Sequence, residues 1–591
     1  MNNIVCERVE SFRSYMNENG LNAFAVVSSD PHSSEYVAER WKCREWLSGF
    51  DGSAGTVVIT AEKAFLWTDS RYWLAADKAL AGTSIELMKD GLAETPSITE
   101  WLSLNLNNGD VVGVDATVCS VAEVNEWRTS LAISGITVKP VNDPFDLLWQ
   151  GRPDIPLSMA HMMPEDISGE AAVSKIARLR DALKKGGIDG MVVTMLDEVA
   201  WLTNLRGCDV EYNPVLVSYM LVTDDSAVLY IDDCKLSDDV KAYLQSQGIS
   251  VASYSEIWQA LREYDKNTLL LQPNRCNAAI GNIVGEKAIF RDSPVALMKA
   301  VKNNAEIHGF ERAMLSEGVA MVKLLEWLKP AVEKGGITEL DVDSKLTELR
   351  STDTDFRGLS FATIAAYGAN CAIVHYEPTP AENAVLAPKG FLLLDCGGQY
   401  LHGTTDVTRT IALGFLTDEE KADYTRVLRG HISLAMAKFP KGTCGTQLDV
   451  LARQWLWQAG ENYLHGTGHG VGHFLNVHEG PHQIRMNNVP TCLVPGMTVT
   501  NEPGLYKAGR HGIRIENTMV VKPYCEGEFG EFYELSPLTI CPIDKTPILP
   551  ELLGDEAIAY LNAYHAMVYE KLSPYLEGDT LLFLKEACSA L

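Results

Sequence analysis

A faint internal repeat constrains the fold of this chain more than any other feature of its sequence. The segment GLNAFAVVSSD at residues 20–30 is echoed by GIDGMVVTMLD at 187–197, an offset of 167 residues. The tripeptide WLS at 46–48 is likewise echoed by WLT at 201–203. Self-similarity of this kind predicts two related modules in tandem.

Each module is expected to alternate helices and strands. An amphipathic helix, expected at 9–19 and again at 171–185, precedes a short apolar strand in each copy. Runs of β-branched residues follow, for example at 56–60 and 219–223. This alternation is typical of α/β layers, and we predict the α/β class.

The length of 591 residues leaves room for roughly three or four domains. A first boundary is expected in the proline-bearing stretch 149–156. A second is expected near 299–304, before a long helix predicted from Ala305 to Leu328 that ends at Pro330. We therefore predict domains at 1–152, 153–304 and 305–525, followed by an extension at 526–591.

The predicted extension carries apolar residues at helical spacing. These residues are Ile558, Leu561, Tyr564, Val568 and Leu572. Such a stripe is more often the packing face of a helix than a functional site. We interpret it as a packing face.

Two aspartates flank a predicted turn between strands. Residues 391–395 form an apolar strand that ends at the glycines 397–398, and residues 404–411 are expected to return beside it. The loop would bring Asp395 and Asp406 together. An ionised and unpaired acid at the end of an apolar strand would cost several kcal/mol, which indicates that each carboxylate has a cation partner.

Histidines recur every four residues in the glycine-rich segment HGTGHGVGH, at His465, His469 and His473. Alternating glycines let the backbone approach a ligand closely. His469 lies between two of them, and a neutral imidazole is a good metal donor, so we predict it as a ligand.

Two further acids end short predicted strands. The strand 499–502 ends in Glu502 before a Pro-Gly pair, and the strand 513–516 ends in Glu516. In a hairpin these two glutamates would face each other. Alternation puts Arg514 on the same face as Glu516, where it is expected to order that carboxylate, although a plain cross-strand ion pair is the alternative.

Together these residues make a hard, mostly oxygen ligand set. The set is Asp395, Asp406, His469, Glu502 and Glu516. It suits a pair of divalent cations such as manganese better than a tetrahedral zinc structural site, although cobalt, iron or zinc could also bind. The sequence therefore predicts a metallohydrolase.

At these residues the sequence resembles the pita-bread-fold metallopeptidases. The segments HGTGHGVGHFLNVHEGP, GTTDVTRT, NEPGLY and GIRIEN are similar to aminopeptidase P of the long, three-domain cytosolic type. The segments at 48–60, 67–73 and 197–207 extend the likeness through both N-terminal modules. The resemblance implies two tandem α/β domains of the creatinase N-terminal kind, followed by a pita-bread catalytic domain.

The resemblance also implies the roles of the ligands. Asp395 would bind one Mn²⁺, His469 and Glu502 the other, and Asp406 and Glu516 would bridge the two ions, which share a hydroxide nucleophile. Glu502 would carry the proton to the leaving nitrogen.

Four more side chains match positions that surround the substrate in this family. His375 and His478 would contact the substrate and stabilise the tetrahedral intermediate, His465 would line the site, and Arg514 would support it. The implied reaction removes the N-terminal residue from peptides with proline in second place, a bond that lacks the usual N–H. His473 departs from the pattern, because long-type relatives commonly have a small residue there.

Two other readings stay open. Prolidase, which cleaves Xaa-Pro dipeptides, shares the ligand set, but it usually carries a single N-terminal module. Some relatives have lost their metals and serve as binding modules, which five intact ligands argue against.

Composition bears on partners and location. Against 50 Lys and Arg residues stand 78 Asp and Glu residues, a formal charge of -28, which disfavours nucleic acid and anionic membranes as partners. Thirteen scattered cysteines without a CxxC pair indicate reduced thiols. The polar N-terminus and the lack of a long apolar run predict a cytoplasmic protein. The resemblance adds a homodimer.

Overall fold

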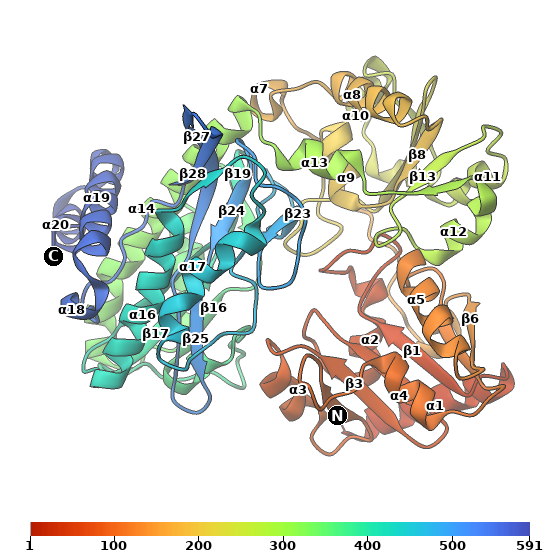
Figure 1. Cartoon of the computed structure of the whole chain (residues 1–591), viewed down its shortest axis with the longest axis horizontal. Coiled ribbons are helices and arrows are strands. Elements are labelled where there is room, and N and C mark those ends of the chain that lie inside the picture. The colour runs from red at the N-terminus through yellow and green to blue at the C-terminus, as the bar shows by residue number, and fades with distance from the viewer. Residues whose placement is uncertain (1) are drawn as a thin grey trace. The chain divides into compact units, whose positions relative to one another are not determined.

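The computed structural model of the chain describes residues 2–591. Two compact units form, the first ending at Ala296 and the second running from Leu297 to Leu591. In Figure 1 the first unit is coloured from red to yellow-green and the second from green to blue.

The first half of the first unit is one six-stranded sheet with helices. Its strands are β1 (Ala23–Val27), β2 (Thr56–Thr60), β3 (Ala64–Thr68), β4 (Glu86–Lys89), β5 (Val111–Asp115) and β6 (Thr137–Val141). Its helices are α1 (Asn2–Glu18), α2 (Cys43–Ser48), α3 (Trp73–Leu80), α4 (Ile98–Asn105), α5 (Val121–Ala132) and α6 (Phe145–Leu148).

The second half contains another six-stranded sheet. Its strands are β8 (Gly190–Val193), β10 (Ser218–Thr223), β11 (Ala227–Ile231), β12 (Ser250–Ala252), β13 (Leu269–Leu271) and β14 (Ala288–Phe290), and β7 (His161–Met162) pairs with β9 (Leu205–Arg206) outside it. The helices are α7 (Glu165–Ser168), α8 (Ala172–Lys185), α9 (Leu196–Thr203), α10 (Asp238–Ser246), α11 (Ile257–Arg262), α12 (Ala278–Val284) and α13 (Pro294–Ala300).

The two sheets have the same topology. Their strand orders are β4-β3-β2-β1-β5-β6 and β12-β11-β10-β8-β13-β14. In both, the strand that carries the repeated segment pairs antiparallel on one side and parallel on the other. The predicted tandem modules are confirmed, as are the amphipathic helices before β1 and β8, although α1 begins at Asn2, seven residues earlier than predicted.

The second unit surrounds several small sheets with long helices. The helices are α14 (Asn304–Lys334), α15 (Glu339–Arg350), α16 (Asp418–Ala435), α17 (Gly445–Trp457), α18 (Pro550–Leu553), α19 (Asp555–Leu572) and α20 (Gly578–Ala587). The prediction that the long helix ends at Pro330 is wrong, because α14 continues through this proline. Ala331 and Val332 are buried, and their packing offsets the missing backbone hydrogen bond.

The strands of the second unit are short, apart from one long hairpin. They are β15 (Phe356–Leu359), β16 (Ile364–Tyr367), β17 (Phe391–Cys396), β18 (Gly398–Tyr400), β19 (Gly403–Thr404), β20 (Val407–Ala412), β21 (Lys438–Pro440), β22 (Gly468–Gly470), β23 (Glu479–Ile484), β24 (Thr498–Asn501), β25 (Gly504–Lys507), β26 (His511–Arg514), β27 (Asn517–Gly527) and β28 (Gly530–Pro537). Helix α16 packs on β24 and β26, and α17 packs on β23 (Figure 1).

The C-terminal helices belong to the core of the second unit. Leu561, Val568 and Leu572 of α19 are fully buried in a cluster that includes Phe310 of α14 and Val427 of α16. The predicted packing face of the extension is confirmed. In Figure 1 these helices are the blue pair beside α14 and α16.

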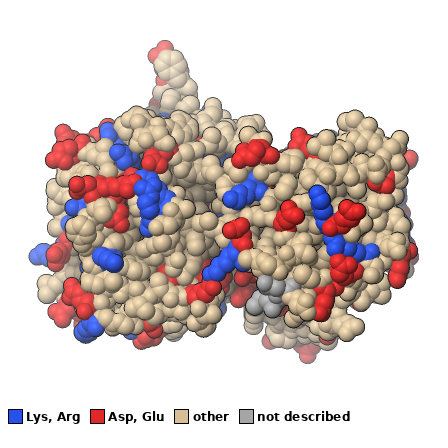
Figure 2. Space-filling model, turned by 90° about the horizontal axis from the view of Figure 1, so that it is seen from below, with Lys and Arg blue, Asp and Glu red and all other residues tan. Residues whose placement is uncertain are grey.

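The surface carries charges of both signs. Figure 2 shows acidic and basic side chains interspersed on the face seen from below. On this face the acids that give the whole chain its formal charge of -28 lie among bases.

Candidate metal centre

The two aspartates lie at neighbouring strand ends, as predicted. Strand β17 pairs antiparallel with β20, and Asp395 lies opposite Thr408, while Cys396 lies opposite Val407. Asp406 immediately precedes β20 and is 4% exposed. The small β18–β19 hairpin fills the loop between them.

The two glutamates face each other, also as predicted. Asn501 of β24 lies opposite Asn517 of β27, and Gly504 of β25 lies opposite Arg514 of β26. Between these paired segments the register continues unchanged, which puts Glu502 opposite Glu516. Pro503 interrupts the ladder at this point and separates it into two short pairs.

Close packing around β22 explains the glycines that flank His469. A Cβ atom on Gly468 would lie 1.9 Å from the Thr500 carbonyl oxygen, and one on Gly470 would lie 2.6 Å from the Glu479 carbonyl oxygen. The Nδ1 atom of His469 is 2.8 Å from the Gly470 carbonyl oxygen. Donation from Nδ1 to this carbonyl directs Nε2 at the carboxylates, where it can hold a proton or, once deprotonated, a metal ion.

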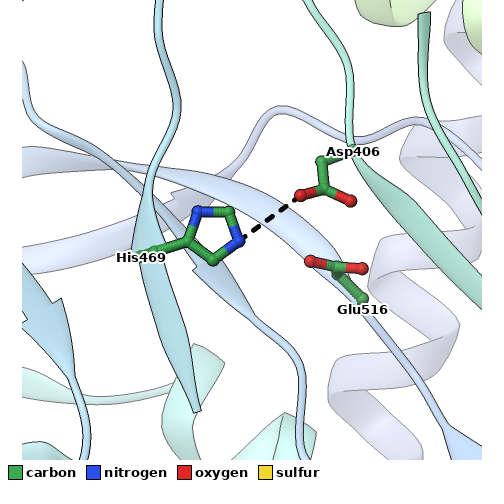
Figure 3. Close-up of side chains that lie close together, drawn as sticks. All are labelled: Asp406, His469 and Glu516. Carbon is green, nitrogen blue, oxygen red and sulfur yellow. Dashed lines mark ion pairs between the residues drawn. The ribbon is translucent and has the colours of Figure 1, made fainter. Parts of the chain in front are cut away.

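Asp406, His469 and Glu516 converge, as Figure 3 shows. Each offers one ligand atom, and these atoms all lie within 4.8 Å of one another. His469 Nε2 is 3.4 Å from an Asp406 oxygen and 3.6 Å from a Glu502 oxygen. Segments from three parts of the sequence, in or next to strands, therefore direct side chains at one point.

Asp395 joins this group through Arg514. The buried Arg514 guanidinium donates to Asp395 Oδ2 at 2.5 Å and not to Glu516, which the sequence had suggested. Thr408 of β20 lies between Arg514 and Glu516, because Arg514 Nε donates to the Thr408 hydroxyl at 3.3 Å and that hydroxyl donates to Glu516 Oε2 at 2.7 Å. The other Asp395 oxygen, Oδ1, is buried without a hydrogen-bond partner among the described residues.

Protons bind strongly at this cluster. Burial raises the pKa of Asp395 and Glu516, and the charge of Asp406 raises both further. Burial also raises the pKa of Glu502 to about 6, against the opposing charge of His469. Burial lowers the pKa of His469, but contacts with Asp406 and Glu502 outweigh it and raise this pKa to about 9.

These features fit divalent cations. Carboxylates this close repel one another, and only protons or cations relieve the repulsion. Asp395 Oδ1 is a buried acceptor without a donor among the described residues, and His469 Nε2, once it loses its proton, offers a nitrogen ligand beside Asp406 and Glu502. The donor set is four carboxylates and one imidazole, which is chemistry that suits hard divalent ions.

His465 and Arg514, both predicted as site residues, line one side of the site together with Tyr506. Tyr506 of β25 lies 2.9 Å from His465 Nε2 and accepts from Arg514 Nη1 at 2.7 Å through its hydroxyl. His465 is also 4.0 Å from Glu502. Sequence reasoning missed Tyr506, although strand alternation puts it on the same face as Glu502 and Gly504.

His375 lies on a loop that one buried acid anchors. Glu339 of α15 accepts hydrogen bonds from the Tyr367 and Ala384 backbone N–H groups at 2.6 Å each and from the Tyr376 hydroxyl at 2.8 Å. The neighbouring Val374 carbonyl oxygen is 3.4 Å from Arg514 Nη1, which brings the loop to the site. No sequence motif marked Glu339.

His478 lies directly beside the predicted ligand. Its ring centre is 4.4 Å from that of His469, in an edge-to-face arrangement. The next residue, Glu479, is fully buried and forms ion pairs with Lys299 and Lys302. This buried charge group fixes the start of β23, which pairs with the strand of His469.

His473 is accommodated by a glycine on α14. The imidazole is 2% exposed and packs on Phe310, with ring centres 5.7 Å apart. A Cβ atom on Gly309 would lie 2.7 Å from His473 Nε2. Because Gly309 has no side chain, helix α14 leaves room for the imidazole of His473, which is larger than the small residue expected at this position.

The fold and the site define a metal-dependent hydrolase. The model of Metallopeptidase family M24 matches residues 309–523, and that of its C-terminal region matches 531–591. The Creatinase/Prolidase N-terminal domain matches twice, at 8–148 and 151–306.

Full-length relatives agree with these matches. Xaa-Pro aminopeptidase 1 of Dictyostelium discoideum is 40% identical, over 97% of this chain and 94% of the relative. Aminopeptidase P1 of Arabidopsis thaliana is 38% identical, over 98% of each. The X-prolyl aminopeptidase of Caenorhabditis elegans, described as a cytosolic enzyme with a di-nuclear active site, superposes with a TM-score of 0.97 at 34% identity, covering 99% of this chain and 100% of that one.

The chain belongs to metallopeptidase family M24, in its group of full-length Xaa-Pro aminopeptidases. It is an enzyme of the hydrolase class with a pita-bread domain and two creatinase-type N-terminal domains. Across residues 2–591, none of the helices has both the length and the apolar character needed to cross a membrane.

Proposed function

We propose that this chain removes the N-terminal residue from peptides whose second residue is proline, using two divalent metal ions, Mn²⁺ in the cell. The observation that carries the proposal is the convergence of Asp406, His469 and Glu516 beside the partnerless Asp395 oxygen. The names of relatives that match along almost their whole length support the choice of substrate.

In this proposal Asp395 would hold one ion, His469 and Glu502 would hold the other, and Asp406 and Glu516 would serve both. When bound, such a pair of ions supplies an acidified water and polarises the carbonyl of the scissile bond. The charge that four carboxylates bring together favours two dications over one. The ion pair between Arg514 and Asp395 orients that ligand.

Glu502 is the proposed proton carrier. In the metal-free chain burial raises its pKa to about 6, so that this carboxyl binds a proton more tightly than an exposed one does. The leaving group is the nitrogen of proline, which has no N–H in the peptide and must gain a proton as the bond breaks. Glu502 would deliver that proton.

The remaining predicted residues bind substrate. His375 and His478 would hold the carbonyl oxygen as negative charge develops on it, and His465 would line the pocket with Tyr506. Hydrogen-bond donors directed at that oxygen contribute most of their energy in the transition state.

We also propose the division of the chain at 1–152, 153–304, 305–525 and 526–591, a homodimer, and a cytoplasmic location. The cytosolic description of the Caenorhabditis elegans enzyme supports the location. The homodimer follows from the family resemblance alone, and sedimentation of the purified protein at several concentrations tests it.

The function is tested on purified, chelator-stripped protein with Arg-Pro-Pro and with Gly-Pro, with and without Mn²⁺. We expect arginine release from the tripeptide only with Mn²⁺, and its loss in Glu502→Ala. Cleavage confined to Gly-Pro would replace the proposal by a prolidase. Cleavage of neither peptide would indicate a binding module.

A further inference from the structure

The C-terminal extension reaches the backbone of the metal centre through one buried arginine. Arg409 of β20 lies three residues after Asp406 and is 2% exposed. Its Nη1 donates to the Glu516 carbonyl oxygen at 2.6 Å and to the Thr408 carbonyl oxygen at 2.8 Å. Arg409 thus holds together two segments that carry proposed ligands.

The outer side of the same guanidinium is held by the extension. Nε donates to the Pro542 carbonyl oxygen at 2.9 Å, and Nη2 donates to the Cys541 carbonyl oxygen at 2.7 Å. Nη2 also lies 3.1 Å from the hydroxyl of Tyr564 on α19 and 2.8 Å from Asn517 Oδ1. Four segments of the second unit therefore meet at Arg409.

All six acceptors around Arg409 are neutral oxygens. The cation approaches Glu516 at the backbone carbonyl, which leaves the carboxylate to Thr408 and to a metal ion. Without a carboxylate to fix it, the orientation of the guanidinium depends on these neutral groups. A buried donor that loses its acceptor costs about 1–3 kcal/mol, so each contact counts.

Tyr564 completes this arrangement. It is 4% exposed, and its hydroxyl lies 2.9 Å from the Cys541 carbonyl oxygen and 3.1 Å from that of Thr539. A hydroxyl donates one proton, so donation to one of these carbonyls directs a lone pair at Arg409. Leu561 and Val568, on either side of Tyr564 in α19, are fully buried.

We propose that Tyr564 is a positioning residue for the metal centre, acting through Arg409 on Glu516. The inference rests on the proposed metal site and adds to it a role for the C-terminal extension. Tyr564 holds Arg409, Arg409 holds the Thr408 and Glu516 backbone, and the Thr408 hydroxyl aims the Glu516 carboxylate. Outer contacts of this kind tune metal affinity.

The test compares two tyrosines of α19. Tyr560 lies one turn before Tyr564, and its hydroxyl is buried without a hydrogen-bond partner among the described residues. Mn²⁺ is titrated into chelator-stripped protein while free Mn²⁺ is followed by electron paramagnetic resonance. We expect Tyr564→Phe to weaken binding by roughly 10-fold, the low end for an outer contact, and Tyr560→Phe to bind as the unmodified protein does.

A second variant tests the route. Arg409→Lys keeps the positive charge but removes the planar guanidinium that bonds to several acceptors at once. If Tyr564 acts through Arg409, the double variant Arg409→Lys/Tyr564→Phe should bind Mn²⁺ no more weakly than Arg409→Lys alone. The proposal fails if Tyr564→Phe binds Mn²⁺ normally, if the two losses multiply, or if Tyr564→Phe does not fold. Absence of Mn²⁺ binding by the unmodified protein would instead overturn the proposed metal site itself.

Discussion

Buried charge is treated differently in the two units of this molecule. In the first unit Asp209 is buried, and it accepts from the buried Lys235 ammonium, the Ser158 hydroxyl at 2.7 Å and the Val217 N–H at 2.7 Å. The carboxylate is satisfied by the polypeptide. A buried pair of this kind has a structural role and needs nothing from outside.

In the second unit three buried carboxylates and the partly buried Glu502 share one guanidinium and one imidazole. Arg514 pairs with Asp395, and His469 lies near Asp406 and Glu502, which leaves negative charge in excess. Asp395 Oδ1 finds no donor among the described residues. The carboxylates of the second unit therefore differ from Asp209 in lacking enough cationic partners within the protein, and this excess of negative charge indicates that the site binds cations.

The largest expected effect is that of removing a ligand shared by both ions. Asp406→Asn should lower Mn²⁺-dependent release of arginine by about 10⁴-fold, a loss typical of one member of a group that acts as a unit. The metal-free variant should be at least as stable as the unmodified protein, because one of the repelling charges is gone. Asp181→Asn, which is exposed on α8, is the control. Full activity of Asp406→Asn would show that this carboxylate is not needed to bind metal, and the proposed difference between the buried acids of the two units would then be wrong.

In the first unit the same change should act on stability instead. Asp209→Asn leaves the Lys235 ammonium buried without its carboxylate, which should cost about 3–5 kcal/mol of unfolding free energy. Urea unfolding measures this loss, and kcat of the folded fraction should stay within about 2-fold of the control, since second-unit chemistry is untouched. A stable but inactive Asp209→Asn protein would contradict this comparison.

Proton competition should make metal binding depend on pH. Glu502, with a pKa of about 6, and His469, with a pKa of about 9, both bind protons more tightly in the folded chain than when unfolded. Their contribution to the stability of the metal-free protein is therefore lost as pH rises, between about 4.5 and 6 for Glu502 and between about 6.5 and 9 for His469.

Mn²⁺ must replace these protons, so its affinity should rise with pH by about 10-fold per unit for one proton displaced, or about 100-fold between pH 6 and pH 8. The stabilisation by a fixed Mn²⁺ concentration, measured as a shift of Tm, should be larger at pH 8. An equal shift at both pH values would mean that the ion binds elsewhere.

The smallest effect should come from the loop that carries His375. Glu339→Gln removes the carboxylate that anchors residues 367–384, and a looser loop should raise KM by about 10-fold with a smaller change in kcat. Glu348→Gln on the same helix alters only an exposed pair with Lys345 and should change neither. An unchanged KM in Glu339→Gln would show that the anchor does not matter to substrate binding.

The sequence predicted the features that depend on short-range pattern. The repeat predicted two related modules, and the apolar run ending in Asp395 and the strand that Pro503 stops after Glu502 predicted where these acids lie. The alternation of side chains along a strand and the positions of glycines can be read from neighbouring residues, so these features needed no knowledge of the tertiary structure. The roles of His375, His465 and His478 stay predictions.

What the sequence did not predict depends on packing between distant segments. Arg514 pairs with Asp395, 119 residues away, because β26 and β17 lie together in the fold. Helix α14 passes Pro330 because the following residues are buried. The contact of Tyr564 with Arg409 spans 155 residues, and no local pattern carries it.

The central claim is that the excess carboxylates of the second unit hold two metal ions. Diffraction from crystals grown with Mn²⁺, recorded at the manganese absorption edge, tests it most directly. The account predicts two anomalous peaks per chain, both among Asp395, Asp406, His469, Glu502 and Glu516. A single peak, or peaks away from these residues, would contradict it.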